Sequence, residues 1–463
     1  MSQRSECPDG PWMASRFNLG VDLPGGRKAV LNTFTGAIAI VKGDTWRRYL
    51  QPGGELRASR AGRSPARDLL FSKGFLVPAK VDEVDLVRIR TQSARFSDAR
   101  LGVTLVPTLA CNLACRYCFE GAAQEAGRGK AMTRDMEGEI VCHIAAAARG
   151  KKHIDICWFG GEPLLSTKAI TRISSRLIPA CDRAGVKYSA SLVTNGYLLS
   201  RETVEALSNC RLRFMQVTVD VPTVEKRDRL GRATIDQVLD NLALAARKLP
   251  AYLRINVSSD DEAEFDRLYD DLVRRRLHAS LKSIYFAYVF GPECGSLGCR
   301  FPASEYPSYV RTVIRERRKA RALGLPVNVS CRLEPLGCVA TSRSHEVIGP
   351  DGLLYKCPED IGLPERAYGS VSAGAAVKLS SWIPWLTYDW LGDGKCARCP
   401  ALAGCGGGCP HRRMFQPGQF ENIHYCQGYL QDLEDRLRLC AEDSERPRRP
   451  GPRRDAVEGR RRR

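Results

Sequence analysis

Long apolar runs and histidines are both scarce in this sequence. No eighteen consecutive residues are apolar, and the longest apolar candidate, residues 140–148, is shorter than a membrane span and contains His143. The first seventeen residues, MSQRSECPDGPWMASRF, contain no apolar segment of the kind that a secretion signal requires. Six histidines in 463 residues leave few imidazole ligands for a zinc site. We therefore expect a cytoplasmic protein that does not enter the membrane.

Basic stretches interleaved with aromatic residues are also missing, although the net charge is +19. From Arg446 onward, the chain has nine arginines and only two acidic residues, Asp455 and Glu458. This Pro/Arg-rich tail therefore carries a net charge of +7 (9 − 2) and is predicted to be disordered. A second basic stretch, RTVIRERRKARALG, follows Ser304 as an N-cap and ends at Gly324, which predicts a helix with a solvated face. Without aromatic side chains to stack on bases, nucleic-acid binding is not expected. The charge favours encounter with an acidic partner instead.

Cysteine, in contrast, is abundant and unevenly placed. The chain has 19 cysteines, of which three lie in 111–118 and eight lie from Cys331 to Cys426. In a reducing compartment, cysteines are more often metal ligands or catalytic thiols than disulfides. Thiols that merely fill a core would be scattered, so the clustering predicts metal sites.

A small α+β domain is predicted before residue 101. The stretches FNLGVDL, RKAVLNT and AIAIV have the pattern of short strands, and GDTWRRYL and SPARDLLFSKGF have the pattern of helices. A charged linker is expected at about residues 80–98. With 43% apolar and 27% charged residues, the chain has an ordinary globular composition and room for about two to four domains.

From residue 101 onward, predicted strands and helices alternate. The strands are GVTLVPTL, HIDICWF, YSASLVTN, RFMQVTVD, AYLRINV and SIYFAYVF, with helical stretches between most of them. Such alternation predicts a parallel sheet, and six units are too few to close an eight-stranded barrel. The fold class is therefore α/β, a partial, open TIM-like βα barrel of about six units with a small N-terminal module and a loop-rich C-terminal domain. The expected segments are a flexible leader (1–15), the small domain (16–100), the core (101–300), a bridging helix and loop (301–337), a cysteine-rich domain (338–440) and a basic tail (441–463).

Polar motifs follow four of these strands where each strand ends. CNLACRYC follows the first strand, GGEP the second, TNG the third, and Asp220 ends the fourth. Because the carboxyl ends of parallel strands lie at one edge of a sheet, these four segments are expected to meet there.

The loop CNLACRYC supplies three thiols, Cys111, Cys115 and Cys118. Three thiolates can hold a four-iron cluster and leave one iron open to a substrate or cofactor. The alternative is a zinc site that takes a distant fourth ligand, but zinc spacing favours pairs of C-x2-C and histidine is scarce.

The C-x3-C-x2-C spacing with an aromatic residue, Tyr117, before the last cysteine resembles that of the radical S-adenosylmethionine (SAM) enzymes. The resemblance implies a [4Fe–4S] cluster whose open iron is chelated by SAM. It further implies one-electron cleavage of SAM to methionine and a 5′-deoxyadenosyl radical that abstracts a substrate hydrogen.

The segment FGGEP resembles the motif that holds the SAM amino group in that family, although alone it could be a strand-to-helix turn. Its glycines permit close backbone approach, and Glu162 offers an anion to an ammonium. Positions that resemble SAM contacts in related enzymes are also present, each of which could instead be a turn or solvent-facing strand residue. The implied SAM-binding residues are Tyr117, Gly160, Gly161, Glu162, Pro163, Thr194, Asn195, Thr218, Asp220, Arg254 and Asn256.

A second cysteine array lies near the C-terminus and resembles the SPASM extension of radical SAM enzymes at every spacing. In isolation, its segment CARCPALAGCGGGC could be a zinc ribbon. The resemblance implies two auxiliary [4Fe–4S] clusters, three clusters in all, and a segment that needs them in order to fold. The first would be bound by Cys331, Cys338, Cys357 and Cys409, and the second by Cys396, Cys399, Cys405 and Cys426.

The other cysteines are predicted to have no ligand role. Cys142, Cys157, Cys181 and Cys210 lie in helix or strand contexts and are expected to pack in the core. Cys7 and Cys440 belong to no pattern. Cys294 and Cys299 follow the sixth strand, where a substrate contact and a plain loop are equally plausible.

SPASM radical SAM enzymes mostly modify peptides or proteins, and the resemblance implies an oxidoreductase of that kind. In the branch that oxidises a sulfatase cysteine or serine to formylglycine, an acidic base directly follows the position of Cys357; here Pro358 does, with Glu359 and Asp360 next. This departure favours maturation of a ribosomally made peptide, by a thioether or carbon–carbon crosslink, with Glu359 and Asp360 as candidate catalytic residues.

Several alternatives stay open from the sequence. They are the sulfatase-maturating type, a non-catalytic iron–sulfur scaffold, and a zinc-containing nucleic-acid-binding protein. The expected partners are a peptide or protein substrate, whose leader segment the small N-terminal module would grip along a strand edge, and an electron donor such as a flavodoxin or ferredoxin.

Overall fold

The computed structural model of the chain forms two compact units, each built from segments distant in sequence. The structure describes residues 11–53, 55–56, 65–115, 117–118, 131–221, 232, 234–258, 260–289, 306–331, 338–372, 375–415 and 425–445. The first unit comprises Met1–Val81, Val329–Arg332 and Leu433–Arg463. The second unit comprises Asp82–Asn328 and Leu333–Asp432.

The first unit contains two small antiparallel sheets, as the predicted strands require. One sheet has the order β2 (Asn18–Leu23), β3 (Arg27–Asn32), β4 (Ile38–Lys42), and the other has the order β5 (Glu55–Leu56), β1 (Trp12–Ala14), β6 (Leu76–Pro78). The predicted helices are confirmed as α1 (Gly43–Thr45) with the following π-helical turn η1 (Trp46–Leu50), and as α2 (Pro65–Ser72).

Two buried asparagines join the segments of this unit. The Asn18 amide donates to the carbonyls of Leu50 (3.0 Å) and Phe75 (2.9 Å). The Asn32 amide donates to Asn18 Oδ1 (3.0 Å) and to the carbonyl of Gly74 (2.8 Å). These amides supply donors to backbone carbonyls of the interior, where buried polar groups need hydrogen-bond partners.

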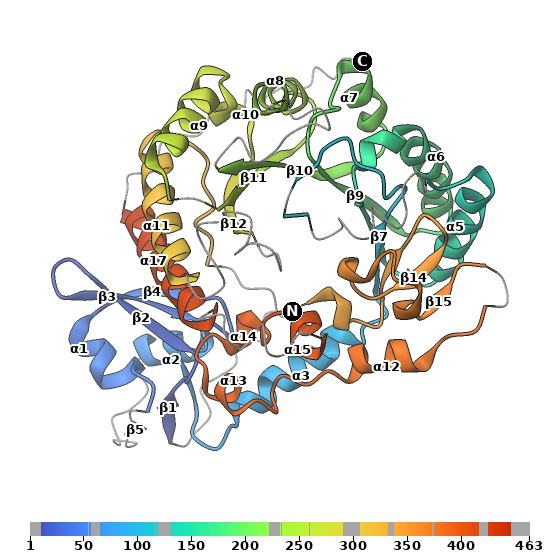
Figure 1. The fold of residues 1–463 in the computed structure, drawn as a ribbon. Coiled ribbons are helices and arrows are strands. Elements are labelled where there is room, and N and C mark those ends of the chain that lie inside the picture. Colours follow the sequence, from blue (N-terminus) through green and yellow to red (C-terminus); the bar gives the residue numbers. More distant parts are fainter. Residues whose placement is uncertain are drawn as a thin grey trace, which may run out of the picture. The chain divides into compact units, whose positions relative to one another are not determined.

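The second unit is organised by one nine-stranded sheet (Figure 1). Its order is β12-β11-β10-β9-β8-β7-β13-β14-β15, and every pairing from β12 to β13 is parallel. The strands are β7 (Arg100–Leu105), β8 (His153–Trp158), β9 (Lys187–Thr194), β10 (Leu212–Val221), β11 (Ala251–Val257), β12 (Ser283–Tyr288), β13 (His345–Ile348), β14 (Leu353–Tyr355) and β15 (Gly369–Ser370). The predicted six-unit partial barrel is confirmed.

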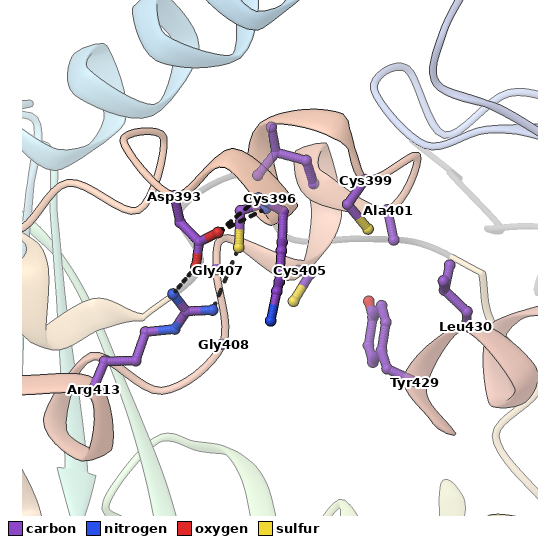
Figure 2. Close-up of a pocket in the computed structure, with 12 residues that line it drawn as sticks. Asp393, Cys396, Cys399, Ala401, Cys405, Gly407, Gly408, Arg413, Tyr429 and Leu430 are labelled. Carbon is purple, nitrogen blue, oxygen red and sulfur yellow. Dashed lines mark hydrogen bonds and ion pairs between the residues drawn. The ribbon is translucent and has the colours of Figure 1, made fainter. Parts of the chain in front are cut away.

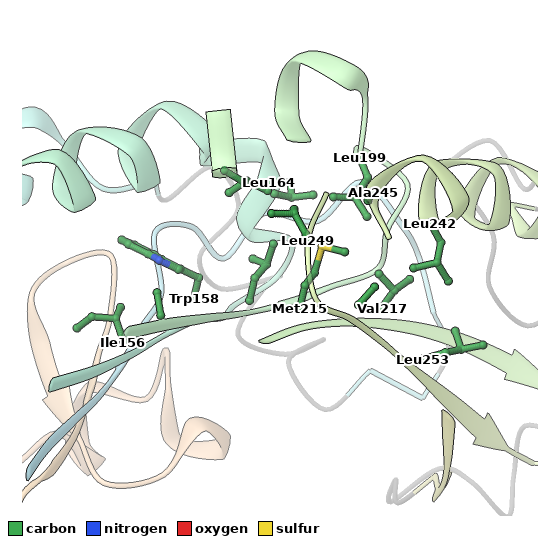
Figure 3. Close-up of a cluster of buried hydrophobic side chains, with 14 of the residues drawn as sticks. Ile156, Trp158, Leu164, Leu199, Met215, Val217, Leu242, Ala245, Leu249 and Leu253 are labelled. Atoms are coloured by element: carbon green, nitrogen blue, oxygen red, sulfur yellow. The ribbon is translucent and has the colours of Figure 1, made fainter. Parts of the chain in front are cut away.

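Helices cover the outer face of the six barrel strands (Figure 1). They are α5 (Arg134–Ala147), η2 (Pro163–Ser166), α6 (Thr167–Arg183), α7 (Arg201–Ser208), α8 (Ile235–Ala245), α9 (Glu262–Arg274), α10 (Leu277–Ser280) and α11 (Tyr306–Ala322). Alternate residues of each strand pack against these helices: in β8, Ile154, Ile156 and Trp158 are fully buried. Figure 3 shows Ile156 and Trp158 in this core with Met215 of β10 and Leu253 of β11. The other side chains of each strand face the barrel interior.

The sheet continues past the six predicted units. Strand β13 pairs in parallel with β7, from His345 opposite Gly102 to Ile348 opposite Leu105. The missing side chain of Gly102 makes room for the ring of His345, since a Cβ there would lie 3.0 Å from His345 Cδ2. Burial lowers the pKa of His345 to about 3, so the imidazole is neutral within the sheet.

The expected charged linker at 80–98 is instead a helix, α3 (Glu83–Arg95), and the first unit ends at Val81. Asp82 caps the helix by accepting from Val84 N (2.8 Å). Arg95, which is 6% exposed, donates to the carbonyls of Thr341 (3.2 Å), Trp385 (3.0 Å), Leu386 (2.8 Å) and Tyr388 (2.9 Å). The chain is not a linker here because this guanidinium binds a carbonyl cluster far along the sequence.

The C-terminal part of the second unit consists of short elements. They are η5 (Val339–Thr341), η6 (Pro358–Asp360), η7 (Pro364–Arg366), α12 (Leu379–Thr387), α13 (Gly394–Arg398), α14 (Leu402–Cys405) and α15 (Pro410–Phe415). Helix α17 (Tyr425–Glu445) follows and runs on into the first unit. Within the described ranges, no helix is long and apolar enough to span a bilayer.

Candidate functional site

The three-cysteine loop directly follows β7 and is held against the segment that follows β8. Gly161 N donates to the carbonyl of Thr108 (3.2 Å), and Glu162 N donates to the carbonyl of Ala110 (2.9 Å). A Cβ at Gly161 would lie 2.4 Å from the carbonyl oxygens of Leu109 and Ala110, so only glycine permits this approach. Gly160, with φ +120°, is likewise restricted to glycine. The two glycines therefore position the loop.

The carboxylate of Glu162 is fully buried and accepts three hydrogen bonds from the chain. Oε1 accepts from Leu164 N (3.0 Å) and Thr194 Oγ1 (2.7 Å), and Oε2 accepts from Asn195 N (2.8 Å). Pro163 begins η2 in the same turn. The structure thus shows Glu162 joining the ends of β8 and β9, and its predicted role toward the SAM amino group stays a prediction.

Asn195 extends this connection to the cysteine loop. Its amide nitrogen Nδ2 lies 3.0 Å from Asn112 Oδ1 and 3.8 Å from Cys111 Sγ, within donor range of the sulfur. The backbone N–H of Leu113 donates to the same sulfur at 3.4 Å. Cys111 therefore receives two neutral donors, which stabilise a thiolate in this position.

A second polar cluster lies at the ends of β10 and β11. Tyr117 donates to Asp220 Oδ1 (2.6 Å), Asn256 Nδ2 donates to the same oxygen (3.0 Å), and Arg254 Nε donates to Asn256 Oδ1 (2.9 Å). Burial, followed by the Asp220 charge, raises the pKa of Tyr117 well above its usual value, so the phenol stays protonated. Thr218 lies two residues before Asp220 in β10, and its Oγ1 is 3.5 Å from Gln216 Nε2, a long hydrogen bond.

The structure therefore brings all four predicted segments to one edge of the sheet. Asp220 Oδ2 in this cluster is buried and has no hydrogen-bond partner among the described residues. An orphaned buried carboxylate oxygen is costly unless a ligand satisfies it. Together with three half-buried thiols, Cys111, Cys115 and Cys118, the residues fit a cluster with one open position and a polar cofactor beside it.

In the C-terminal array, Cys357 and Cys338 belong to a small apolar cluster that includes Trp385, and Cys409 lies close enough to Cys338 to interact with it electrostatically. Burial raises the pKa of all three thiols, and Cys409 and Cys338 contribute to the shifts of Cys338 and Cys357, respectively. Three adjacent buried thiolates require a cation, because burial and mutual repulsion both oppose their charge. This donor set fits the first predicted auxiliary cluster.

The second predicted ligand group lines a separate cavity of about 180 Å³ (Figure 2). Cys396, Cys399 and Cys405 form part of its wall, opposite Tyr429 and Leu430. Among the described residues, no group of three His, Cys, Asp or Glu side chains could hold a single metal ion. Thiols around a cavity fit a cluster of several irons.

Two further predicted ligands are not placed with these groups. Cys331 lies in the first unit, where its Sγ is 3.7 Å from Cys440 Sγ. Cys426 lies in the first turn of α17, but its side chain falls outside the described residues, as do Cys7, Cys294 and Cys299. The ligand roles of Cys331 and Cys426 stay predictions, and Cys440, for which no role was predicted, has Cys331 as its neighbour.

The cysteines expected to pack in the core do so in part. Cys181 and Cys210 are buried, and Cys157 is half-buried in β8. The expectation for Cys142 is wrong: its thiol is exposed because it lies on the outer side of α5, whose buried face is formed by Ile140, Val141 and Ile144. A helix presents only one face to the core, and the sequence pattern did not show on which face of α5 Cys142 lies.

The candidate catalytic carboxylates lie beside a histidine that the sequence did not reveal. His411 Nε2 is 3.0 Å from Asp360 Oδ1, and its Nδ1 is 3.3 Å from Glu359 Oε2. Asp360 and His411 are both buried. His411 lies two residues after Cys409. This closeness in sequence to a predicted cluster ligand is the signal that could have identified His411.

Two more basic side chains in the array were missed. Lys356, next to Cys357, is 1% exposed and donates to the carbonyls of Ser342 and His345 at 2.5 Å. Burial lowers the pKa of Lys356 to about 8. Arg413 donates to Cys396 Sγ at 3.4 Å. Neither contact has a sequence signature, because each donor reaches its partner only through tertiary packing.

Comparisons with known proteins agree with this geometry. The family model described as the radical SAM superfamily matches residues 105–272. A serine-type anaerobic sulfatase-maturating enzyme of Klebsiella aerogenes is 27% identical over 353 residues, covering 71% of this chain and 83% of the relative. The radical SAM cyclopropyl synthase TigE of Paramaledivibacter caminithermalis is 26% identical over 153 residues, covering 30% of this chain and 32% of the relative.

A solved structure supports the fold independently. Native anSMEcpe with bound AdoMet and Cp18Cys peptide has a TM-score of 0.56 at 18% identity, covering 75% of this chain and 100% of that chain. The radical SAM family uses a [4Fe–4S] cluster and SAM, which the thiols and polar groups at the sheet edge fit. Residues 105–272 are therefore a radical SAM domain, and the chain has homology to the anaerobic sulfatase-maturating enzymes, which are SPASM-type radical SAM enzymes.

Proposed function

We propose that this enzyme oxidises a side chain of a peptide, and that its substrate is a ribosomally made precursor in which it forms a thioether or carbon–carbon crosslink. The observation that carries the radical chemistry is the junction of the cysteine loop with Gly161, Glu162 and Asn195. When bound there, the reduced cluster and SAM supply a 5′-deoxyadenosyl radical that takes one hydrogen atom from the substrate.

The chain's own residues hold that chemistry in place. The contacts of Gly161 and Glu162 fix the loop, and the cluster of Tyr117, Asp220 and Asn256 offers the unpaired Asp220 Oδ2 to a polar group of SAM. Crosslink formation removes two hydrogens from the substrate: one leaves as an atom, and the other leaves as a proton and an electron. The clusters that the cysteine array is predicted to hold would accept that electron, and an acidic flavodoxin or ferredoxin would exchange it with the enzyme.

A peptide substrate is supported by the first unit, which presents an open strand edge. In the β2-β3-β4 sheet, β4 pairs with β3 and with no other strand among the residues that the structure describes. Asn32 N donates to the carbonyl of Ala37, and hydrogen-bonded pairs alternate along an antiparallel ladder, so the backbone groups of Ile38 and Ile40 point away from β3. A leader segment can add to this edge as a fourth strand.

The similarity to sulfatase-maturating enzymes favours a second candidate, oxidation of a sulfatase cysteine or serine to formylglycine. The array argues against it. Pro358 stands where that branch has its acidic base, and the next two carboxylates, Glu359 and Asp360, both face His411, at 3.3 Å from its Nδ1 and 3.0 Å from its Nε2. A base engaged in this way must give up its partner before it can accept a substrate proton.

The test is product analysis with two substrates. The anaerobically reconstituted enzyme, with SAM and a strong reductant, is incubated with small peptides encoded next to its gene and, separately, with a sulfatase-derived peptide that contains cysteine or serine. We expect a neighbouring peptide to lose two hydrogens by mass spectrometry. Conversion of the sulfatase peptide alone would establish the second candidate instead.

A matched pair of proline variants tests the leader edge. Ile40→Pro removes an outward N–H from β4 without breaking its ladder with β3. By the same alternation, Asp22→Pro does so on the opposite edge strand, β2. We expect Ile40→Pro to weaken leader binding by about tenfold, equivalent to roughly one or two lost hydrogen bonds, and Asp22→Pro to leave it unchanged. Equal effects of the two variants on leader binding would show that β4 is not the docking edge.

A further inference from the structure

The guanidinium of Arg413 is fixed against one thiol of the cysteine array (Figure 2). Its Nη2 lies 3.4 Å from Cys396 Sγ, and its Nη1 lies 2.9 Å from Asp393 Oδ2. These contacts use two nitrogens of one planar group, so the charge cannot move from the sulfur without breaking the ion pair. The Arg413 side chain is 20% exposed, which limits the competition of water for both contacts.

Asp393, the partner of Arg413, is itself held by the helix that carries the thiol. Its Oδ1 accepts from the backbone N–H groups of Lys395 (2.7 Å) and Cys396 (3.3 Å), as an N-cap of α13. The contacts therefore form a closed ring from Cys396 N through Asp393 and Arg413 to Cys396 Sγ. The cation position is set by the same turn that sets the position of the sulfur.

A cation at this position would stabilise the negative charge that the cluster gains when it is reduced. One-electron reduction adds a negative charge to an iron–sulfur cluster, and donors to its sulfurs together with nearby positive charge raise its reduction potential. A guanidinium stays protonated at neutral pH, and the hydrogen bond that it donates to the Asp393 carboxylate stabilises its charge.

We propose that Arg413 is a positioning residue that raises the reduction potential of the auxiliary cluster bound by Cys396, Cys399 and Cys405, so that this cluster accepts an electron more readily than the cluster of the 111–118 loop. At that loop, Cys111 receives two neutral donors, Asn195 Nδ2 at 3.8 Å and Leu113 N at 3.4 Å. The inference rests on the auxiliary-cluster part of the proposed function and is independent of which peptide is modified.

The test is a reductive titration of the full-length chain with dithionite, monitored by electron paramagnetic resonance. A Cys115→Ala background removes the signal of the loop cluster. Arg413→Gln keeps an amide donor and removes the charge, and we expect the midpoint potential of one auxiliary cluster to fall by about 59 mV, a tenfold change for one electron. Arg413→Lys keeps the charge without the fork, and we expect a smaller fall.

Arg398→Gln is the matched control, because Arg398 lies in the same helix, α13, with its side chain exposed. Its loss should leave the potential unchanged. An unchanged potential in Arg413→Gln, or an equal fall in Arg398→Gln, would overturn the proposal. If Arg413→Gln fails to retain its iron, Arg413→Lys decides: a lowered potential supports the proposal and the parent value overturns it. Because no peptide is present, the result stands apart from the substrate assignment.

Discussion

The loop at 111–118 follows β7, a strand with parallel neighbours on both sides, whereas Cys396, Cys399 and Cys405 lie on or beside helices of four and five residues. The barrel beneath the loop has a large continuous core, which includes Leu105 and Trp158. The apolar cluster beside Cys338 and Cys357 in the array is small, with Ala340 and Trp385 as its other buried members. Helices this short are not stable alone. The loop is thus positioned by the core of the barrel, whereas we expect the array to depend for its stability on what its thiols bind.

The two regions also differ in the charge offered to their sulfurs. Cys111 faces amide N–H groups, and Cys396 faces a guanidinium held by Asp393. A site that must deliver a strongly reducing electron gains from neutral surroundings, and a site that must accept one gains from a cation. The difference implies a direction for electron flow that the spacing of the cysteines does not reveal.

The largest expected effect is the loss of SAM cleavage when the 111–118 loop is altered and the C-terminal array is left intact. Cys115→Ala removes a thiolate of the open cluster, so formation of 5′-deoxyadenosine from SAM should fall to background. The array should keep its iron, reducing the total from about twelve to about eight per chain. Iron analysis and chromatography of the nucleoside check both parts. Retained SAM cleavage in a variant with eight irons would show that the loop is not the SAM site.

Removal of all iron is expected to destabilise the C-terminal array more than the barrel. After oxidation and chelation, we expect amides of residues 394–410 to lose protection in hydrogen exchange, because metal ligation supplies much of the stability of a small domain. Strands β8 to β11 should keep their protection, since their core is formed by side chains. Equal loss of protection in both regions would mean that the barrel also depends on iron.

A glycine substitution tests how the barrel holds the loop. Gly161→Ala places a Cβ 2.4 Å from two loop carbonyls, which must shift. We expect SAM cleavage to fall by about ten- to hundredfold through misplacement of the loop. Gly138→Ala in α5 is the control: its Cβ would meet only Arg176 Nη1 at 3.9 Å, and it should stabilise the helix by about 1 kcal/mol. Full activity in Gly161→Ala would contradict the close approach.

The smallest expected effect concerns the neutral donor at Cys111. Asn195→Ala removes the amide from the sulfur, and the midpoint potential of the loop cluster should fall by less than the tenfold change, about 59 mV, expected for Arg413→Gln. Asn241→Ala provides the comparison, since Asn241 donates to the carbonyls of Gly196 (3.1 Å) and Tyr197 (2.7 Å) in the same turn without touching the sulfur. A matching fall in Asn241→Ala would assign the effect to the turn rather than to the donor.

The barrel and the sheet-edge segments could be predicted because their signals are local. Strands such as β8 bury every second residue, and a motif that ends a parallel strand has only one edge on which to lie. The contact of Gly161 with the loop follows from the same logic. In these regions sequence order alone determines which segments meet.

The features that escaped prediction depend on partners far apart in the sequence. Strand β13 has four residues, and its partner β7 lies more than two hundred residues upstream. Helix α3 has a strongly charged sequence that is typical of a linker, and its packing depends on Arg95 and Arg90, which donate to distant carbonyls. His411 and Arg413 likewise face groups that no spacing rule connects to them.

Arg95 also has a consequence for how the chain is made. Its acceptor carbonyls lie 246 to 293 residues later in the sequence, so during synthesis the helix that carries it leaves the ribosome long before those acceptors exist. Until then the guanidinium stays in water, and α3 lacks the contact that holds it. Long-range closure of this kind slows folding and exposes intermediates. A chain that stops before Thr341 would lack all four acceptors, so Arg95 distinguishes a finished polypeptide from an interrupted one.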